Sequence, residues 1–204
     1  MESKRDLDSL SVSKKLAFIL LLCERMMPAF QKFSADTGFY ISRYQGYLER
    51  GWAYLNGKSN LGGYEDASRD CYDNAPDTEA FDHVLTSAAL NATLSIGALM
   101  SFLSDHNVDH IIEVTDLARD TVALYVQITE AVPPLSLGFD EVMNHPLVQQ
   151  ELLRQEEDLR FLSSLPDNVE REEVQQIKKR LERMSELIPF DMEPGQSKKN
   201  KMYL

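Results

Sequence analysis

The stretch HVLTSAALNATLSIGALMSFLS, His83–Ser104, runs for 22 residues without an Asp, Glu, Lys or Arg. It is too long for a strand and predicts a helix that is either buried on all sides or crosses a membrane. Small side chains recur at every fourth position on one face of this helix: Ala89, Thr93, Gly97 and Ser101. Such a stripe lets the backbone of another helix approach closely.

Three features of the same stretch favour a buried core helix over a membrane span. Asn91 lies in its middle, six hydroxyl side chains reduce its hydropathy, and neither flank carries the Lys and Arg cluster that sets membrane orientation. We therefore interpret the stretch as the central helix of a soluble, all-helical domain, with no membrane association.

The composition limits which classes of partner and which cellular compartment are expected for this protein. A net charge of −12, from 33 acids and 21 bases, disfavours nucleic-acid binding, because phosphates would be repelled over most of the surface. Cys23 and Cys71 have no neighbour at metal-ligand spacing, which predicts free thiols in a cytoplasmic protein. The apolar run Leu16–Cys23 follows two lysines but ends without a small-residue cleavage site, so we expect no export.

The residues around the central stretch predict the fold. Asp77 or Thr78 is expected to cap the central helix, and the tight turn at 105–107 forces the next helix to run antiparallel to it. The sequence predicts an all-α, single-domain bundle of six or seven helices at 1–190, built on a hairpin of 79–104 and 107–130. Residues 191–204 are expected to form a flexible tail containing lysines.

Apolar spacings of three and four predict the remaining helices. The first helix begins near Ser11–Ser13 and is expected to kink or break at Pro28. It is followed by a helix at 39–56, a short helix at 64–72, one helical turn at 140–143 and a helix that begins at Pro146 and ends at Pro166. The last helix directs five side chains inward: Val174, Ile177, Leu181, Met184 and Ile188. Asp167 and Glu170 are expected to form the capping box of the last helix.

Three segments together carry a resemblance to a known family. They are LCERMMPAF at Leu22–Phe30, VDHIIEVT at Val108–Thr115 and NHPLVQQELLRQ at Asn144–Gln155. Their order and spacing resemble the YjaG-like bacterial proteins, a family classed as a domain of unknown function. The resemblance implies a cytoplasmic, single-domain, all-helical protein and brings no activity, cofactor or catalytic residue.

Motifs for metal, nucleotide or nucleophile chemistry are weak. The sequence has no Gly-rich phosphate loop, G-x-S-x-G, C-x-x-C or H-E-x-x-H. His106, His110 and Glu113 share one helical face and could bind a divalent metal, but they show only the order H-x-x-E. The acidic segment 65–82 lacks the alternation of a calcium loop. We expect no metal and no cofactor.

Polar residues beside apolar stripes form the candidate site: Glu24, Arg25, His110, Glu113, Glu151 and Gln155. Unpaired buried charges are costly, so we expect residues of this kind on different helices to converge. A structural ion-pair network is the favoured interpretation, and a ligand pocket is the alternative.

Two classes of function follow from these observations. The favoured one is a non-enzymatic interaction or regulatory protein that works through its acidic surface, its aromatic second helix or its amphipathic last helix. Homo-oligomerisation is one form that this interaction could take. Arg43 and Arg50 on that second helix suggest base stacking, but the segment carries too few bases. The alternative is a small-ligand or divalent-metal binding protein, or an enzyme, that uses the polar cluster.

Overall fold

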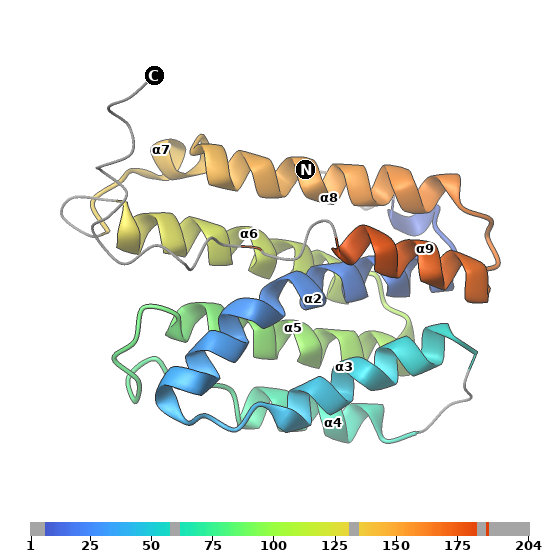
Figure 1. The fold of residues 1–204 in the computed structure, drawn as a ribbon, viewed down its shortest axis with the longest axis horizontal. Helices are drawn as coiled ribbons and strands as arrows, with labels where there is room; N and C mark the ends of the chain where they lie inside the picture. The colour runs from blue at the N-terminus through green and yellow to red at the C-terminus, as the bar shows by residue number, and fades with distance from the viewer. Residues whose placement is uncertain (1–6, 58–61, 131–134, 183–186, 188–204) are drawn as a thin grey trace.

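The computed structural model describes residues 7–57, 62–130, 135–182 and 187, and within these the fold is a single all-α domain without strands (Figure 1). The helices in chain order are α2 (Val12–Thr37), α3 (Ser42–Leu55), α4 (Tyr64–Asp73), α5 (Thr86–Asp105), α6 (Asp109–Thr129), α7 (Phe139–Met143), α8 (Pro146–Ser164) and α9 (Arg171–Glu182). The predicted all-helical fold is confirmed, and the five-residue α7 is the single turn expected at 140–143.

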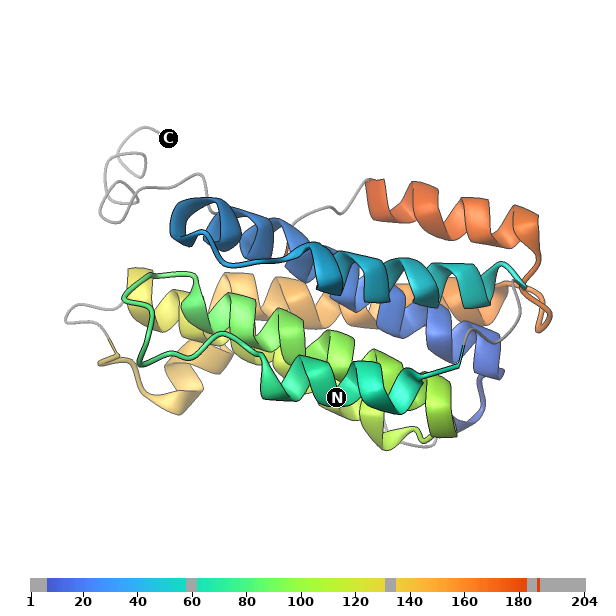
Figure 2. The ribbon, with the colours of Figure 1, turned by 90° about the horizontal axis from the view of Figure 1, so that it is seen from below.

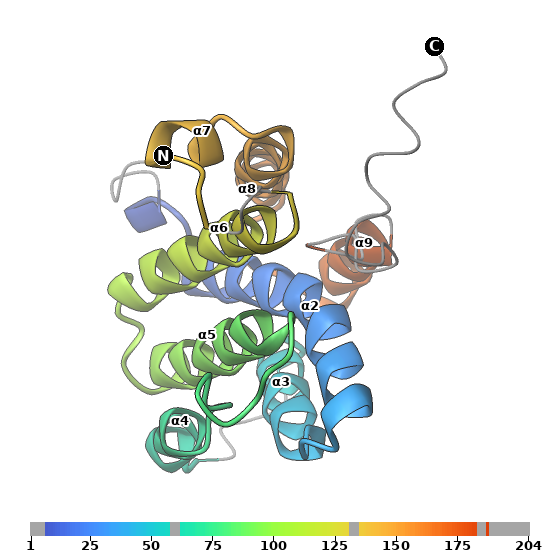
Figure 3. The same cartoon turned by 90° about the vertical axis from the view of Figure 1, so that its left-hand side faces the viewer.

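The central helix is α5, and four other helices surround it. Figure 3 shows α2, α3, α4 and α6 around α5, and Figure 2 shows α9 at one side of the bundle. α5 is long and apolar enough to span a bilayer, but 78% of its most apolar window is buried by the rest of the fold. Packing between helices therefore accounts for its composition.

The predicted hairpin of α5 and α6 is present, with a different start. His106, at φ 58°, ends α5 in a left-handed conformation, and the Asp105 carboxylate accepts the Asn107 N–H at 2.8 Å. The expected start at residue 79 and the cap by Asp77 or Thr78 are wrong, because α5 begins at Thr86. The Asp77 carboxylate instead accepts the Glu79 N–H at 2.8 Å and closes a separate turn.

The aromatic side chain that follows this turn holds the chain out of the helix. The Phe81 ring packs edge-on against Phe33 and Phe39, with centroids 5.2 and 5.9 Å apart. This contact ties the segment before α5 to Phe33 of α2 and to Phe39, which follows α2. The sequence pattern missed it because the contact is made between residues far apart in the chain.

The stripe of small residues on α5 admits another helix at close range, as predicted, and that helix is α4. Ser68 and Ser101 share a hydrogen bond of 2.8 Å between their hydroxyl oxygens. A Cβ atom added to Gly97 would lie 3.1 Å from both the Cys71 Cβ and the Tyr72 ring. An alanine at this position would force Cys71 or Tyr72 to shift by a few tenths of an ångström.

The longest helix, α2, passes through Pro28 without a break. Figure 3 shows that its second half bends away from the direction of the first half, so the expected kink is present and the expected break is not. Pro28 removes the donor for the Glu24 carbonyl. One residue further on, the Leu187 N–H donates to the Arg25 carbonyl at 3.1 Å and so connects Leu187 to the bend.

The start of α9 also differs from the prediction. The capping box of Asp167 and Glu170 does not form, because α9 begins at Arg171 and the Glu173 carboxylate accepts the Glu170 N–H at 3.0 Å. Asp167 instead accepts from the buried Lys14 ammonium at 2.9 Å. Val174 and Ile177 are buried as expected. Met184, Ile188 and the predicted tail at 191–204 lie outside the described residues.

Two glycine substitutions test the close contact between α4 and α5. Gly46, inside α3, has no atom within 4 Å of an added Cβ, so Gly46→Ala should stabilise the fold by about 0.5 to 1 kcal/mol. Gly97→Ala forces the added Cβ against Cys71 and Tyr72 and should destabilise it by about 1 to 3 kcal/mol. Urea unfolding of both variants measures the difference. A stabilising Gly97→Ala would mean that α4 does not pack this closely on α5.

Candidate functional site

A buried arginine lies at the centre of the candidate site. Arg25 on α2 donates from Nη2 to Glu151 Oε1 at 3.1 Å and from Nη1 to Asp158 Oδ2 at 2.5 Å. The exposed fractions of these three side chains are 1%, 1% and 0%. Both carboxylates come from α8, so each end of the guanidinium group faces one turn of the same helix.

Two further side chains extend the network to other helices. Gln155 donates from its amide to Glu151 Oε1 at 3.0 Å and to the Thr115 carbonyl of α6 at 3.3 Å. Arg180 of α9 donates from Nε to Asp158 Oδ1 at 2.6 Å. Two arginines and two carboxylates therefore balance in charge and join α2, α6, α8 and α9. We name this group the Arg25 network: Arg25, Glu151, Gln155, Asp158 and Arg180.

The charge state of Arg25 follows from its surroundings. Burial by itself lowers the pKa of the guanidinium, but Glu151 and Asp158 outweigh it, so the pKa is raised above its usual value. Arg25 is thus a permanent cation. Arg25 Nε and Glu151 Oε2 are buried without a hydrogen-bond partner among the described residues. Arg25, Glu151 and Asp158 are closed to solvent, whereas Arg180 is 21% exposed and lies 3.8 Å from the exposed Glu157; such an arrangement is typical of a structural ion-pair network.

Glu24 points to a different place from Arg25, because neighbouring residues on a helix lie about 100° apart. Its carboxylate accepts the Trp52 indole N–H of α3 at 2.6 Å. The Lys178 ammonium of α9 lies 4.9 Å from the centre of the Trp52 ring. Burial raises the pKa of the Glu24 carboxyl, and the Trp52 hydrogen bond and Lys178 partly counteract this.

A groove of about 290 Å³ between α2 and α3 contains Glu24. The side chains that line it come from both helices: Glu24, Met27, Gln31, Gln45, Leu48 and Glu49. We name it the Glu24 groove.

His110 and Glu113 form a third location, at the surface beside the turn between α5 and α6. His110 Nε2 lies 3.1 Å from the Asp105 carboxylate, and its Nδ1 lies 3.9 Å from Glu113. The Tyr72 hydroxyl donates to Glu113 at 3.1 Å. His106 caps α5 instead of joining them. In the part of the chain that the structure describes, no three His, Cys, Asp or Glu side chains are grouped so that they could hold a metal ion.

The six predicted site residues thus divide into three places. Arg25, Glu151 and Gln155 converge as expected, whereas Glu24 lies in its own groove and the pair His110 and Glu113 lies at the surface. The expected convergence of the whole set is wrong, because Glu24 and Glu113 find partners in Trp52 and Tyr72.

Sequence reasoning also missed two members of the Arg25 network, Asp158 and Arg180. Glu151, Gln155 and Asp158 follow one another at steps of four and three, which places them on one helical face, and that spacing was the available signal. Arg180 follows the buried Ile177 by three residues, so it lies on the inner side of α9.

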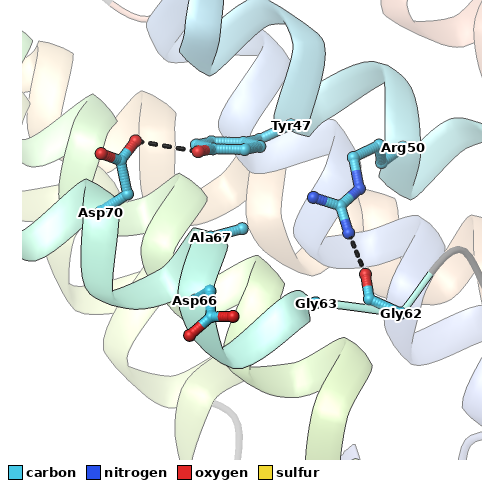
Figure 4. A pocket seen from close by; sticks show the side chains of 7 residues that line it. All are labelled: Tyr47, Arg50, Gly62, Gly63, Asp66, Ala67 and Asp70. Atoms are coloured by element: carbon cyan, nitrogen blue, oxygen red, sulfur yellow. Dashed lines mark hydrogen bonds between the residues drawn. The ribbon is translucent and has the colours of Figure 1, made fainter.

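The aromatic helix predicted at 39–56 is α3, and a wide hollow separates part of it from α4 (Figure 4). Arg50, one of the two arginines of α3, lines this hollow. Arg50 donates to the Gly62 carbonyl and lies over the rings of Tyr47 and Tyr64, at 5.8 and 5.0 Å. Tyr47 donates to Asp70 at 2.8 Å.

The other arginine of this helix is engaged in the same way. Arg43 pairs with Asp70 at 3.0 Å and lies 5.9 Å from the ring centres of Tyr40 and Tyr44. Both cations are thus occupied by tyrosines, a carbonyl or a carboxylate of the same chain, which accounts for the aromatic helix by packing between α3 and α4.

The Arg25 network predicts how strongly substitutions within it change the stability of the fold. Arg25→Met leaves Glu151 buried without its cation and should lower the free energy of unfolding by about 3 to 5 kcal/mol. Adding Glu151→Gln removes the unpaired charge, so the double variant should lose less than Arg25→Met alone. Chemical denaturation of the single and double variants measures this coupling.

The matched control is Arg160→Met. Arg160 pairs with Glu156 on the exposed side of the same helix, so its loss should change stability by less than about 1 kcal/mol. Equal, small losses for Arg25→Met and Arg160→Met would show that Arg25 is not held in a closed network.

Comparison with known proteins places this architecture in a family. The model described as "Protein of unknown function (DUF416)" matches residues 2–186. The chain is 28% identical over 159 residues to the uncharacterized protein YjaG of Escherichia coli (strain K12), covering 77% of this chain and 80% of that protein. The YjaG protein of Salmonella typhimurium matches with the same identity and coverage.

A solved structure shows the same fold. The crystal structure of a DUF416 family protein from Shewanella baltica OS155 matches with a TM-score of 0.76 at 23% identity, and the match covers 90% of this chain and 94% of that one. The family match over nearly the whole chain agrees with the resemblance to YjaG-like proteins, and the chain therefore belongs to the DUF416 family of proteins of unknown function.

Proposed function

We propose that this chain is a non-enzymatic interaction protein of the cytoplasm that binds a partner protein through the corner between α6 and α7. The observation that carries the proposal is a pair of exposed apolar side chains at this corner. Phe139 and Leu135 are 78% and 66% exposed, the highest values among the large hydrophobic residues that the structure describes. We name residues 135–139 the corner surface.

The corner surface is anchored to α6 by hydrogen bonds. The Leu135 N–H donates to the Gln127 carbonyl at 2.9 Å, and the Gln127 amide donates to the Leu137 carbonyl at 2.9 Å. The Gly138 N–H donates to the Glu141 carboxylate at 2.8 Å and caps α7. The apolar side chains are therefore presented in a fixed position, which reduces the entropy lost when a partner binds.

Leu135 is unfavourable in the free protein in two respects. Its φ of 62° is in the left-handed region, which costs roughly 1 to 2 kcal/mol for a residue with a side chain. The same side chain exposes most of its apolar surface to water. The backbone of Leu135 contributes the hydrogen bond to Gln127, but its exposed side chain adds no packing to the fold, so a role in binding is the better explanation.

Charge indicates the chemistry of the partner. From Asp120 to Leu153 the sequence contains neither Lys nor Arg. Asp140 and Glu141, next to Phe139, are both exposed. A partner that places apolar side chains between basic ones complements this surface, whereas a second copy of the chain brings acid against acid. We therefore favour a basic partner over the self-association considered from the sequence.

Two further observations support an interaction protein. The charges of Arg25, Glu151 and Asp158 are paired in the interior, so they are not positioned to act on a substrate. Cys23 and Cys71 are buried free thiols, and burial raises the pKa of Cys71 to about 12, which keeps this thiol in its unreactive protonated form. Free thiols are the usual state in the cytoplasm.

A pair of designed peptides tests the corner surface. A helical peptide of Leu and Lys should bind the protein, and a matched peptide of Leu and Glu should not. Phe139→Ser should weaken binding of the Leu–Lys peptide by about tenfold, equivalent to roughly 1.4 kcal/mol. Fluorescence anisotropy of the labelled peptide measures affinity, and the melting temperature confirms that the variant is folded.

Leu153→Ser is the matched control, since Leu153 is also an exposed leucine but lies on α8. Equal weakening by Phe139→Ser and Leu153→Ser would contradict a specific corner surface. Light scattering of the unmodified protein adds a second outcome: a dimer that Phe139→Ser abolishes would replace the basic partner with a second copy of the chain.

A further inference from the structure

The Glu24 groove has a lining with one chemical character. Two of its six side chains are carboxylates, Glu24 and Glu49, and two are carboxamides, Gln31 and Gln45. The remaining two are apolar, and no Lys or Arg lines the groove. The groove therefore offers several hydrogen-bond acceptors, two carboxylates without a paired cation in the lining, and an apolar surface.

Glu24 lacks a partner of opposite charge at contact distance. Among the described residues the Trp52 indole is its one hydrogen-bond donor, and no Lys or Arg nitrogen lies within 4 Å of its carboxylate. Burial raises the pKa of the Glu24 carboxyl, so its ionised form is not fully stabilised by the protein. A cation from outside would supply the missing stabilisation.

An ammonium group of the protein already acts on this carboxylate without pairing with it. Lys178 of α9 holds its Nζ 4.9 Å from the centre of the Trp52 ring, and its charge lowers the pKa of Glu24. The face of an aromatic ring attracts alkylammonium groups, and here Lys178 occupies it. The Glu24 carboxylate therefore already responds to an ammonium charge within the same chain.

We propose that the Glu24 groove binds a linear alkylammonium compound of the diamine or polyamine class. One ammonium group pairs with Glu24 and another with Glu49, and the methylene chain between them lies against Met27 and Leu48. The carboxamides of Gln31 and Gln45 accept the remaining N–H donors. This binding site goes beyond the proposed interaction function and uses a different face of the bundle.

A metal ion fits the same groove less well. Mg²⁺ and Ca²⁺ require about six or more oxygen ligands arranged around one point. The two carboxylates here come from different helices, α2 and α3, and apolar side chains share the lining. A ligand with charges at separate points and an apolar chain between them matches this arrangement.

Calorimetric titration of the full chain with spermidine and with cadaverine tests the site. Both amines should bind, and Glu24→Gln and Glu49→Gln should each weaken binding by about tenfold, because each removes one charge pair. The control is Glu79→Gln, which removes the same charge from an exposed turn outside the groove and should leave affinity unchanged. A magnesium titration should give a weaker signal than either amine.

Thermal unfolding separates loss of binding from loss of folding. Because the pKa of Glu24 is raised in the folded state, the native protein binds more protons than the unfolded chain between the two pKa values, so stability falls as pH rises through that window. Glu24→Gln removes this cost while its amide oxygen still accepts from Trp52. The ligand-free variant should therefore melt higher than the wild type at neutral pH, with the difference disappearing in acid.

The result that supports the proposal is weaker amine binding by a more stable Glu24→Gln variant. No binding of either amine to the wild type would overturn it. Equal weakening by Glu24→Gln and Glu79→Gln would also overturn it, since that pattern reports general attraction to an acidic protein. Phe139→Ser should bind the amines like the wild type, so failure of the amine site and failure of the corner surface are distinguishable.

Discussion

The burial of Arg25 is the constraint on which the arrangement of the helices depends. Removing a guanidinium group from water costs several kcal/mol, and ion pairs with well-placed carboxylates must offset this cost. Glu151 and Asp158 lie two turns apart on α8 and meet opposite ends of the guanidinium group, so α8 cannot slide along α2 without separating the charges. Arg180 then fixes α9 on the same carboxylate.

Close contacts at glycine fix the other side of α2. A Cβ atom added to Gly51 of α3 would lie 2.9 Å from Leu20, five residues before Arg25, and 3.3 Å from Leu99 of α5. The apolar core supplies most of the driving force for folding, while these contacts and the Arg25 network determine the register of the helices. The Glu24 groove and the corner surface both lie on helices that this framework holds.

The sequence allowed prediction of the elements whose signals are local. The charge-free run predicted α5, its stripe of small residues predicted a closely packed neighbour without saying which helix it is, and Pro146 marked the start of α8. The start of α5 at Thr86 could not be read in the same way, because it depends on Phe81 packing against Phe33 and Phe39. Asp167 satisfied the pattern of a cap but pairs with Lys14, more than 150 residues away in the chain.

The candidate site was predicted only in part for the same physical reason. The cost of burial predicted that Arg25 must find acids, but the sequence does not state which acids lie opposite. Asp158 follows Glu156 and Glu157 in a run that is typical of a solvated helix face, although it is completely buried. Glu24 and Arg25 are adjacent in sequence, yet the helix directs them to different partners. The two residues were therefore predicted to belong to one polar cluster, but their tertiary contacts place them in different ones.

Hydrogen exchange of Arg25→Met, followed by mass spectrometry, tests the central claim most directly. If the Arg25 network holds α8 and α9 in register on α2, peptides from these two helices should exchange faster in the variant. Peptides from α4 and α5, which are fixed by the Gly97 contact, should change much less. Protection of α8 and α9 that falls no more than that of α4 and α5 would contradict this role of the buried arginine.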